Sequence, residues 1–213
     1  MNKNDFIKFM IECEALLFGD FTLKSGRSSP YFVNTGRYDN GKSLKTLCSY
    51  YTELIEQNQT DFNVLYGPAY KGIPLASITA TMLESFPKVS FNRKEVKDHG
   101  DTGSFLGHIP QNGDRIAIIE DVTTAGTSIK ETIELLKKLN INAEIVALFI
   151  SVDRMEKGIN TDISATKQIS KEYGIPVYSI IKTSDIVDYL KKSNNEYAEK
   201  IQEYLNQYGA KEE

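Results

Sequence analysis

Two adjacent carboxylates, Glu120 and Asp121, precede a run of small and hydroxyl-bearing residues, and this combination suits a sugar phosphate. Backbone N–H groups at a helix start, together with hydroxyls, favour a phosphate monoester. Carboxylates repel phosphate but suit ribose hydroxyls, or a cation that develops on a ribose ring. The segment therefore predicts a phosphoribosyl site; the alternative is a tight turn whose acids only cap the next helix. The side chains that suit this site are the carboxylates of Glu120 and Asp121 and the hydroxyls of Thr123, Thr124, Thr127 and Ser128.

The residues on either side place this segment at the edge of a sheet. Residues 116–119 are continuously apolar, which is typical of a strand buried on both faces of a parallel sheet. Apolar residues at 129, 133, 136 and 139 then form one helical stripe. A strand-to-helix turn at the carboxyl edge of a parallel sheet is where α/β proteins place ligands.

The remaining pattern alternates between helices and strands and contains no repeats. Helices are predicted over 4–17, 42–57, 73–85, 163–172 and parts of 183–208, and strands over 31–33, 62–66, 89–91, 143–151 and 177–181. Such alternation predicts an α/β fold with a doubly wound, mostly parallel central sheet flanked by helices.

A second loop, Gly-Pro-Ala-Tyr-Lys-Gly at 67–72, directly follows a predicted strand. Glycines at both ends let the backbone approach a ligand closely, and Lys71 supplies a positive charge. An ordinary Gly-Pro turn is the alternative.

The third segment, 92–103, has no apolar period and carries Arg93, Lys94, Lys97 and His99. We expect a mobile loop. Its cations suit a lid that closes over pyrophosphate, whereas a solvated hairpin with balanced charges is the alternative.

The fourth segment, 21–34, combines basic, hydroxyl and aromatic residues. Lys24 offers charge and Phe32 offers an aromatic face, which suits a flat, anionic, heteroaromatic acceptor. Alone, the segment would be interpreted as a surface hairpin with a Pro turn.

Composition limits the classes of protein. With 213 residues, 40% of them hydrophobic, the chain is expected to form a single domain with a small appendage. A net charge of -4 argues against a nucleic-acid partner. We expect no membrane partner and no signal peptide, because charged residues interrupt the first ten positions and no apolar run is long enough to span a bilayer. Cys13 and Cys48 fit reduced thiols in the cytoplasm.

The acid pair with its small-residue loop resembles the phosphoribosyl pyrophosphate (PRPP) motif of the type I phosphoribosyltransferases. All four segments, in order and spacing, resemble the orotate phosphoribosyltransferases of that family over nearly the whole chain. The resemblance implies a type I phosphoribosyltransferase fold in one domain, 1–213, in which residues from about 1 to 40 contribute an N-terminal hood over the active site. It also implies a cis peptide bond between Ala69 and Tyr70.

The resemblance further implies a role for individual residues. Pyrophosphate contacts would come from Tyr70, Lys71, Arg93, Lys94, Lys97 and His99, and orotate contacts from Lys24, Phe32, Val33, Thr124 and Arg154. Contacts to the ribose 5-phosphate would come from Glu120, Asp121, Val122, Thr123, Thr124, Ala125, Gly126, Thr127 and Ser128. Lys97, His99 and Asp121 would be the catalytic residues. Two positions depart from the family pattern, since Val33 stands where many relatives have an aromatic residue and Glu120 replaces the commoner Asp.

The implied reaction transfers the 5-phosphoribosyl group from PRPP to orotate, giving orotidine 5′-monophosphate and pyrophosphate. Mg²⁺ would arrive with PRPP, near Glu120 and Asp121 but without direct protein ligands. The implied assembly is a homodimer with shared active sites. Two alternatives stay open: a phosphoribosyltransferase for another base, which would not need both Lys24 and Arg154, and a non-catalytic PRPP-sensing regulator, which would need a DNA-binding module.

Overall fold

The computed structural model describes residues 1–23, 25–94, 104–122, 126–158 and 161–211. In chain order, the elements are α1 (Lys3–Glu12), β1 (Leu16–Thr22), β2 (Ser28–Val33), the 3₁₀ helix η1 (Thr35–Arg37), α2 (Gly41–Asn58), β3 (Val64–Tyr66), α3 (Gly72–Met82), β4 (Lys88–Asn92), β5 (Phe105–Gly107), β6 (Arg115–Ile119), α4 (Thr127–Lys138), β7 (Glu144–Asp153), α5 (Ala165–Tyr173), β8 (Val177–Lys182), α6 (Thr183–Lys192) and α7 (Tyr197–Tyr208).

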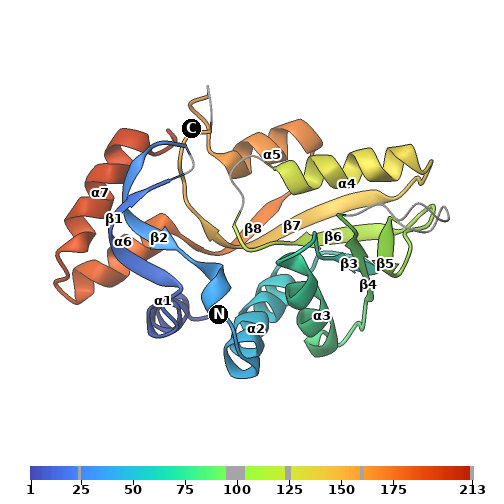
Figure 1. The fold of residues 1–213 in the computed structure, drawn as a ribbon, viewed down its shortest axis with the longest axis horizontal. Coiled ribbons are helices and arrows are strands. Elements are labelled where there is room, and N and C mark those ends of the chain that lie inside the picture. Colours follow the sequence, from blue (N-terminus) through green and yellow to red (C-terminus); the bar gives the residue numbers. More distant parts are fainter. Residues whose placement is uncertain (24, 95–103, 123–125, 159–160, 212–213) are drawn as a thin grey trace.

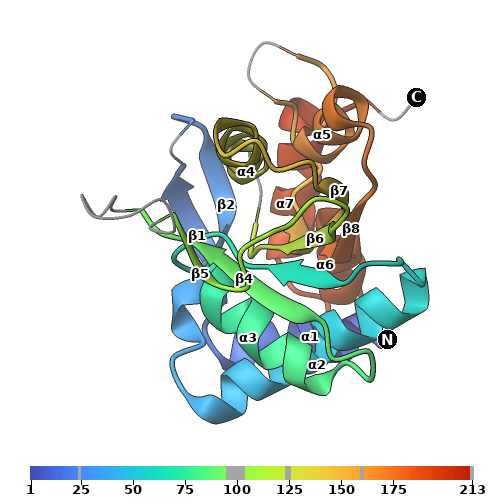
Figure 2. The ribbon, with the colours of Figure 1, turned by 90° about the vertical axis from the view of Figure 1, so that its right-hand side faces the viewer.

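The central element is a six-stranded sheet in the order β5-β4-β3-β6-β7-β8 (Figure 1). Every pairing in it is parallel except that of β4 with β5. Helices α2 and α3 cover one face, and α4 and α5 cover the other (Figure 2). The predicted α/β fold with a mostly parallel sheet flanked by helices is confirmed.

The residues of β6 show why the sheet is covered on both faces. Ile116 and Ile118 belong to the apolar cluster that also holds Ile129 of α4. Ala117 and Ile119 belong to the cluster that holds Leu47 of α2. Because side chains alternate along a strand, a continuous apolar run gives each face of the sheet apolar side chains that pack against helices, as the sequence predicted.

The N-terminal segment differs from the predicted helix over 4–17. Helix α1 ends at Glu12, and Glu14 adopts a positive φ of 54° that turns the chain. Leu16 then starts β1, which pairs antiparallel with β2. The apolar residues up to Leu17 match helical spacing, but those after the turn pack as a strand, so the prediction was wrong beyond residue 12.

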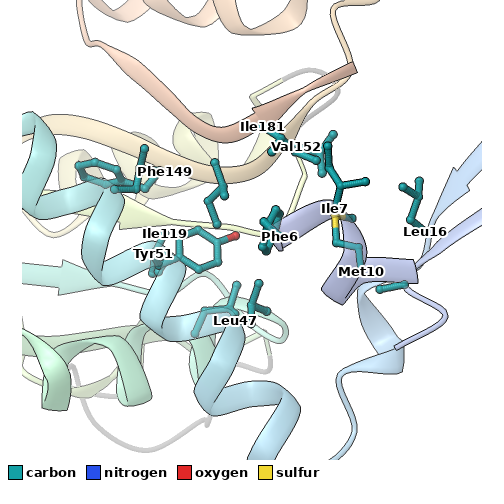
Figure 3. Close-up of a cluster of buried hydrophobic side chains, with 14 of the residues drawn as sticks. Phe6, Ile7, Met10, Leu16, Leu47, Tyr51, Ile119, Phe149, Val152 and Ile181 are labelled. Carbon is teal, nitrogen blue, oxygen red and sulfur yellow. The ribbon is translucent and has the colours of Figure 1, made fainter. Parts of the chain in front are cut away.

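The hairpin of β1 and β2 forms a separate two-stranded sheet that α7 covers. Phe18 of β1 stacks on Tyr197, and Tyr31 of β2 meets Tyr204 edge-on. Figure 3 shows Phe6, Ile7 and Met10 of α1 beside the buried side chains of α2 and the sheet, and all of these belong to one core cluster. This shared core fixes the hairpin relative to the sheet.

Strand β5 was not predicted, because only three residues form it and they lie at the sheet edge. Strand β1 and the 3₁₀ helix η1 were not predicted either. The boundaries of the elements that were predicted after α1 differ from the observed ones by a few residues at most. Within the ranges that the structure describes, no helix has the length and apolar character needed to cross a membrane.

Candidate active site

The loop at 67–72 joins β3 to α3, and its two terminal glycines touch each other. A Cβ on Gly67 would lie 2.1 Å from the carbonyl oxygen of Gly72, and a Cβ on Gly72 would lie 2.7 Å from the carbonyl carbon of Gly67. The Ala69–Tyr70 peptide bond is cis, as the resemblance implied. The amide of Ala69 donates to Asn92 Oδ1 at 2.7 Å, which ties the loop to the end of β4. The close backbone approach explains why both positions require glycine.

The loop brings Lys71 to the acid pair at the end of β6. Lys71 Nζ lies 2.8 Å from Asp121 Oδ2. The hydroxyl of Thr35, from η1, accepts a hydrogen bond from Lys71 at 2.9 Å and donates one to Asp121 Oδ2 at 2.5 Å. Strands β3 and β6 are adjacent and parallel, so the loops that follow them meet at one sheet edge.

The backbone of the acid pair is held from two directions. The carbonyl oxygen of Asp121 accepts hydrogen bonds from the amide and the hydroxyl of Ser151, at 2.8 and 2.6 Å. The buried Tyr51 of α2 donates its hydroxyl to the carbonyl of Glu120 at 2.5 Å. The Asp121 side chain also accepts from the amide of Val122 at 2.7 Å. These bonds fix the direction in which the Asp121 carboxylate points.

The two carboxylates sit in different environments. Burial raises the pKa of Glu120 to about 7, with the nearby charge of Asp121 adding to the effect and a hydrogen bond from Ser128 opposing it. Ser128, predicted for phosphate, donates its hydroxyl to Glu120 Oε1 in this structure. Near neutral pH, Glu120 therefore exists partly as a neutral acid, which can both donate to and accept from a ribose hydroxyl.

The structure describes part of the predicted phosphate loop. Gly126 precedes α4 with a left-handed φ of 65°, and a Cβ there would lie 2.7 Å from Ile169 Cγ1. Thr127 is exposed at the first position of α4, and the first amides of a helix have no acceptor within the helix itself. The predictions for Thr123, Thr124 and Ala125 lie outside the described residues.

The cations after β4 lie near the loop at 67–72. Lys94 Nζ is 5.9 Å from the ring centroid of Tyr70, a residue that is 63% exposed. The Nε of Arg93 is buried and has no hydrogen-bond partner in the described part of the chain. Lys94 thus lies beside the residue that precedes Lys71, and the pyrophosphate contacts of Arg93 and Lys94 stay a prediction. The predictions for Lys97 and His99 lie outside the described residues.

Arg154, at the end of β7, does not act alone. Its Nε and Nη2 lie 2.7 and 2.6 Å from Glu156 Oε1. Its Nη2 is also 3.3 Å from Ser29 Oγ. The guanidinium lies 4.3 Å from the ring centroid of Tyr31. Glu156 also lies 3.6 Å from Arg27 Nη1. The guanidinium is thus held against β2, and the sequence analysis missed its carboxylate partner.

The structure brings together only some of the predicted acceptor residues. By strand alternation, Val33 shares the β2 face that carries Ser29 and Tyr31, the face that Arg154 contacts. Phe32 is on the other face, where it is 36% exposed and stacks on Phe21 with ring centroids 5.5 Å apart. Lys24 lies outside the described residues.

Two cavities border these elements. One of about 180 Å³ is lined by Thr35, Lys71, Asp121 and Ser151 on its polar side, and by Tyr38, Leu44, Leu47 and Leu75 on its apolar side. A larger cavity of about 400 Å³ lies along β8 and α5 and borders none of the predicted site residues that the structure describes. The smaller one is the candidate site, because both members of the ion pair line it.

Thr35, Tyr51, Ser151 and Glu156 are site residues that the sequence analysis missed. Each is a single polar residue outside any motif, and each reaches the site from another element. Strand order alone would have pointed to Ser151, because β7 pairs with β6.

Glu120 predicts a specific pH dependence of stability in the protein without substrate. Its pKa is about 7 when folded and near 4.5 when unfolded, so the folded state holds more protons between these values and loses stability as the pH rises through them. The side chain at position 120 cannot ionise in Glu120→Gln, so the variant should not lose this stability. Between pH 5 and pH 8, the unfolding free energy of the wild type should therefore fall by about 2 kcal/mol relative to that of the variant, and its melting temperature should fall with it. Calorimetry across this range measures the difference. The exposed Glu84→Gln is the control, and parallel curves for Glu120→Gln and wild type would contradict the assignment.

Comparison with known proteins agrees with this geometry. Residues 36–180 match the model of the phosphoribosyl transferase domain. The chain is 48% identical to an orotate phosphoribosyltransferase of Clostridium botulinum (strain Alaska E43 / Type E3), with 98% of each chain covered. It is 47% identical to that of Clostridium beijerinckii, again over 98% of each.

A solved structure gives the same result. The crystal structure of orotate phosphoribosyltransferase from Francisella tularensis superposes with a TM-score of 0.85 at 40% identity, covering 96% of this chain and 99% of that one. The predicted type I phosphoribosyltransferase fold is thereby confirmed. The chain belongs to the orotate phosphoribosyltransferase family within the phosphoribosyl transferase domain proteins.

Proposed function

We propose that this chain transfers the 5-phosphoribosyl group from PRPP to orotate, giving orotidine 5′-monophosphate and pyrophosphate, a step of pyrimidine biosynthesis. The observation that carries the proposal is the 2.8 Å approach of Lys71 to Asp121 where two strands end. This ion pair supports the proposal, because a cation suited to pyrophosphate lies directly beside an anion suited to the ribose hydroxyls. The names of the full-length relatives support orotate as the acceptor.

Charge separation in the reaction explains this arrangement. When the bond from C1 of the ribose to the pyrophosphate oxygen breaks, positive charge builds on the ribose and negative charge on the leaving group. Asp121 and Glu120 hold the ribose hydroxyls on the positive side. Lys71, Arg93 and Lys94 face the negative side. Preorganised charges of this kind lower the barrier because they need no reorientation during the reaction.

Magnesium fits this site as a companion of the substrate. In the part of the chain that the structure describes, no three His, Cys, Asp or Glu side chains gather as a metal site. The two carboxylates at 120 and 121 suit an ion that keeps water and phosphate oxygens as its ligands. Bound with PRPP, Mg²⁺ would neutralise charge on the pyrophosphate.

Orotate would complete the site from the side of β2. In the part of the chain that the structure describes, Arg154 contacts Glu156 and Ser29 through Nε and Nη2, and Nη1 would donate to the acceptor carboxylate. Phe32, Val33, Lys24 and Thr124 remain proposed acceptor contacts, and Lys97 and His99 remain proposed proton donors to pyrophosphate. We further propose a cytoplasmic homodimer whose lids complete the neighbouring sites; the free thiols of Cys13 and Cys48 support a reducing compartment.

A pyrophosphate-release assay with Mg²⁺ and PRPP tests the acceptor. Release should require orotate and should not occur with uracil or adenine. Arg154→Ala should raise KM for orotate roughly tenfold or more, because a charge-assisted hydrogen bond is lost, and should leave KM for PRPP within about twofold. Arg115→Ala is the control, because Arg115 pairs with Asp61 and Glu144 at the start of β6, opposite the end that leads to the acid pair. Faster release with adenine than with orotate, or no release with any acceptor, would overturn the proposal.

Lys97→Ala tests the lid. Loss of one donor to the leaving group should lower kcat by at least about tenfold while the protein stays folded, whereas Lys171→Ala on the exposed end of α5 should not change kcat. If sites are shared between subunits, mixing Lys97→Ala with Asp121→Asn protein should recover activity in hybrid dimers. Normal turnover by Lys97→Ala would refute its role, and absence of recovery would refute sharing.

A further inference from the structure

Thr35 lies between the two oppositely charged groups of the site. Its hydroxyl donates to Asp121 Oδ2 at 2.5 Å and accepts from Lys71 Nζ at 2.9 Å. An ammonium group only donates and a carboxylate only accepts, whereas a hydroxyl does both. Thr35 can therefore serve both partners at once.

The position of Thr35 in the chain links the acceptor side to the donor side. It follows β2 by two residues, and the neighbouring amide of Asn34 donates to the carbonyl of Ala15 at 2.8 Å, which anchors this segment to the hairpin. In the described part of residues 1–40, Thr35 alone hydrogen-bonds to the side chains of Lys71 or Asp121. The hairpin and the acid pair are thus joined by one hydroxyl.

The surroundings strengthen these bonds. Thr35, Lys71 and Asp121 line the same 180 Å³ cavity as the apolar side chains of Tyr38, Leu47 and Leu75. Hydrogen bonds to charged groups gain strength where water is limited. Lys71 is well exposed, with 63% of its side chain accessible, whereas the Asp121 side chain is 18% accessible. Lys71 is therefore the partner that is open to an incoming anion, whereas Asp121 is largely enclosed.

We propose that Thr35 is a positioning residue for the ribosyl donor, an inference that rests on the proposed function. When Lys71 leaves Asp121 for the pyrophosphate, the Thr35 hydroxyl keeps the Asp121 carboxylate oriented toward the ribose hydroxyls. Without that hydroxyl, the Asp121 carboxylate would have neither Thr35 nor Lys71 as a donor once Lys71 contacts the pyrophosphate. The expected consequence is weaker binding of PRPP with little effect on orotate.

Three substitutions separate the hydroxyl from the shape of the side chain. Thr35→Val keeps the volume and removes the hydroxyl, Thr35→Ala removes both, and Thr35→Ser keeps the hydroxyl. Titration calorimetry with Mg²⁺ and PRPP should show about tenfold weaker binding for the Val and Ala variants and binding within about twofold of wild type for the Ser variant. KM for PRPP should rise in parallel, whereas KM for orotate should stay within about twofold. Thr81→Val, exposed at the end of α3, is the matched control.

Unchanged PRPP affinity in both Thr35→Val and Thr35→Ala would overturn the inference. So would equal losses in the Ser and Val variants, or a rise in KM for orotate as large as that for PRPP, because a general structural defect would produce either. A wild-type protein that binds PRPP but releases no pyrophosphate with orotate would overturn the proposed function. The PRPP affinities alone would then decide the role of Thr35.

Discussion

The attraction between Lys71 and Asp121 is the interaction on which the geometry of the site depends, and strand order makes it possible. The two residues are 50 positions apart in sequence, yet the loops that carry them follow adjacent parallel strands. Both loops contain glycines at positions where a Cβ would not fit. Gly67 and Gly72 touch each other in the loop after β3, and Gly126 packs on Ile169 in the segment after β6. Opposite charges thus meet before any substrate arrives.

The rest of the molecule holds this pair in place. Tyr51 from α2 and Ser151 from β7 fix the backbone of the acids, and Thr35 fixes the Asp121 side chain. The hairpin that carries the proposed acceptor residues shares a core with α1, α2 and the sheet (Figure 3). The packing of this core therefore fixes the hairpin relative to the acid pair, and Lys71 is the exposed member of the ion pair.

Much of the fold was predictable because hydrophobic periodicity encodes it directly. Strand β6 and helix α4 follow from their apolar patterns, and the acid pair with its small-residue loop follows from residue type. Helix 4–17 was predicted too long, because the turn at Glu14 comes from a backbone conformation rather than from a break in hydrophobicity. Strand β5 is too short to show a pattern.

The sequence predicted the motifs of the candidate site but not the contacts between them. The pairing of Arg154 with Glu156 and the bridge through Thr35 depend on where separate elements meet in space. Likewise, the pKa of Glu120 follows from burial, which no local sequence pattern specifies. Sequence thus identified the charged groups, and tertiary structure determined which of them oppose each other.

A crystal structure of the complex with PRPP and Mg²⁺ tests the central claim most directly. Lys71 Nζ and Asp121 Oδ2, 2.8 Å apart in the free protein, should separate beyond about 4 Å, the limit of an ion pair. Lys71 should contact the pyrophosphate, and Asp121 should contact the ribose hydroxyls. An intact Lys71–Asp121 pair, with PRPP bound elsewhere, would contradict the account.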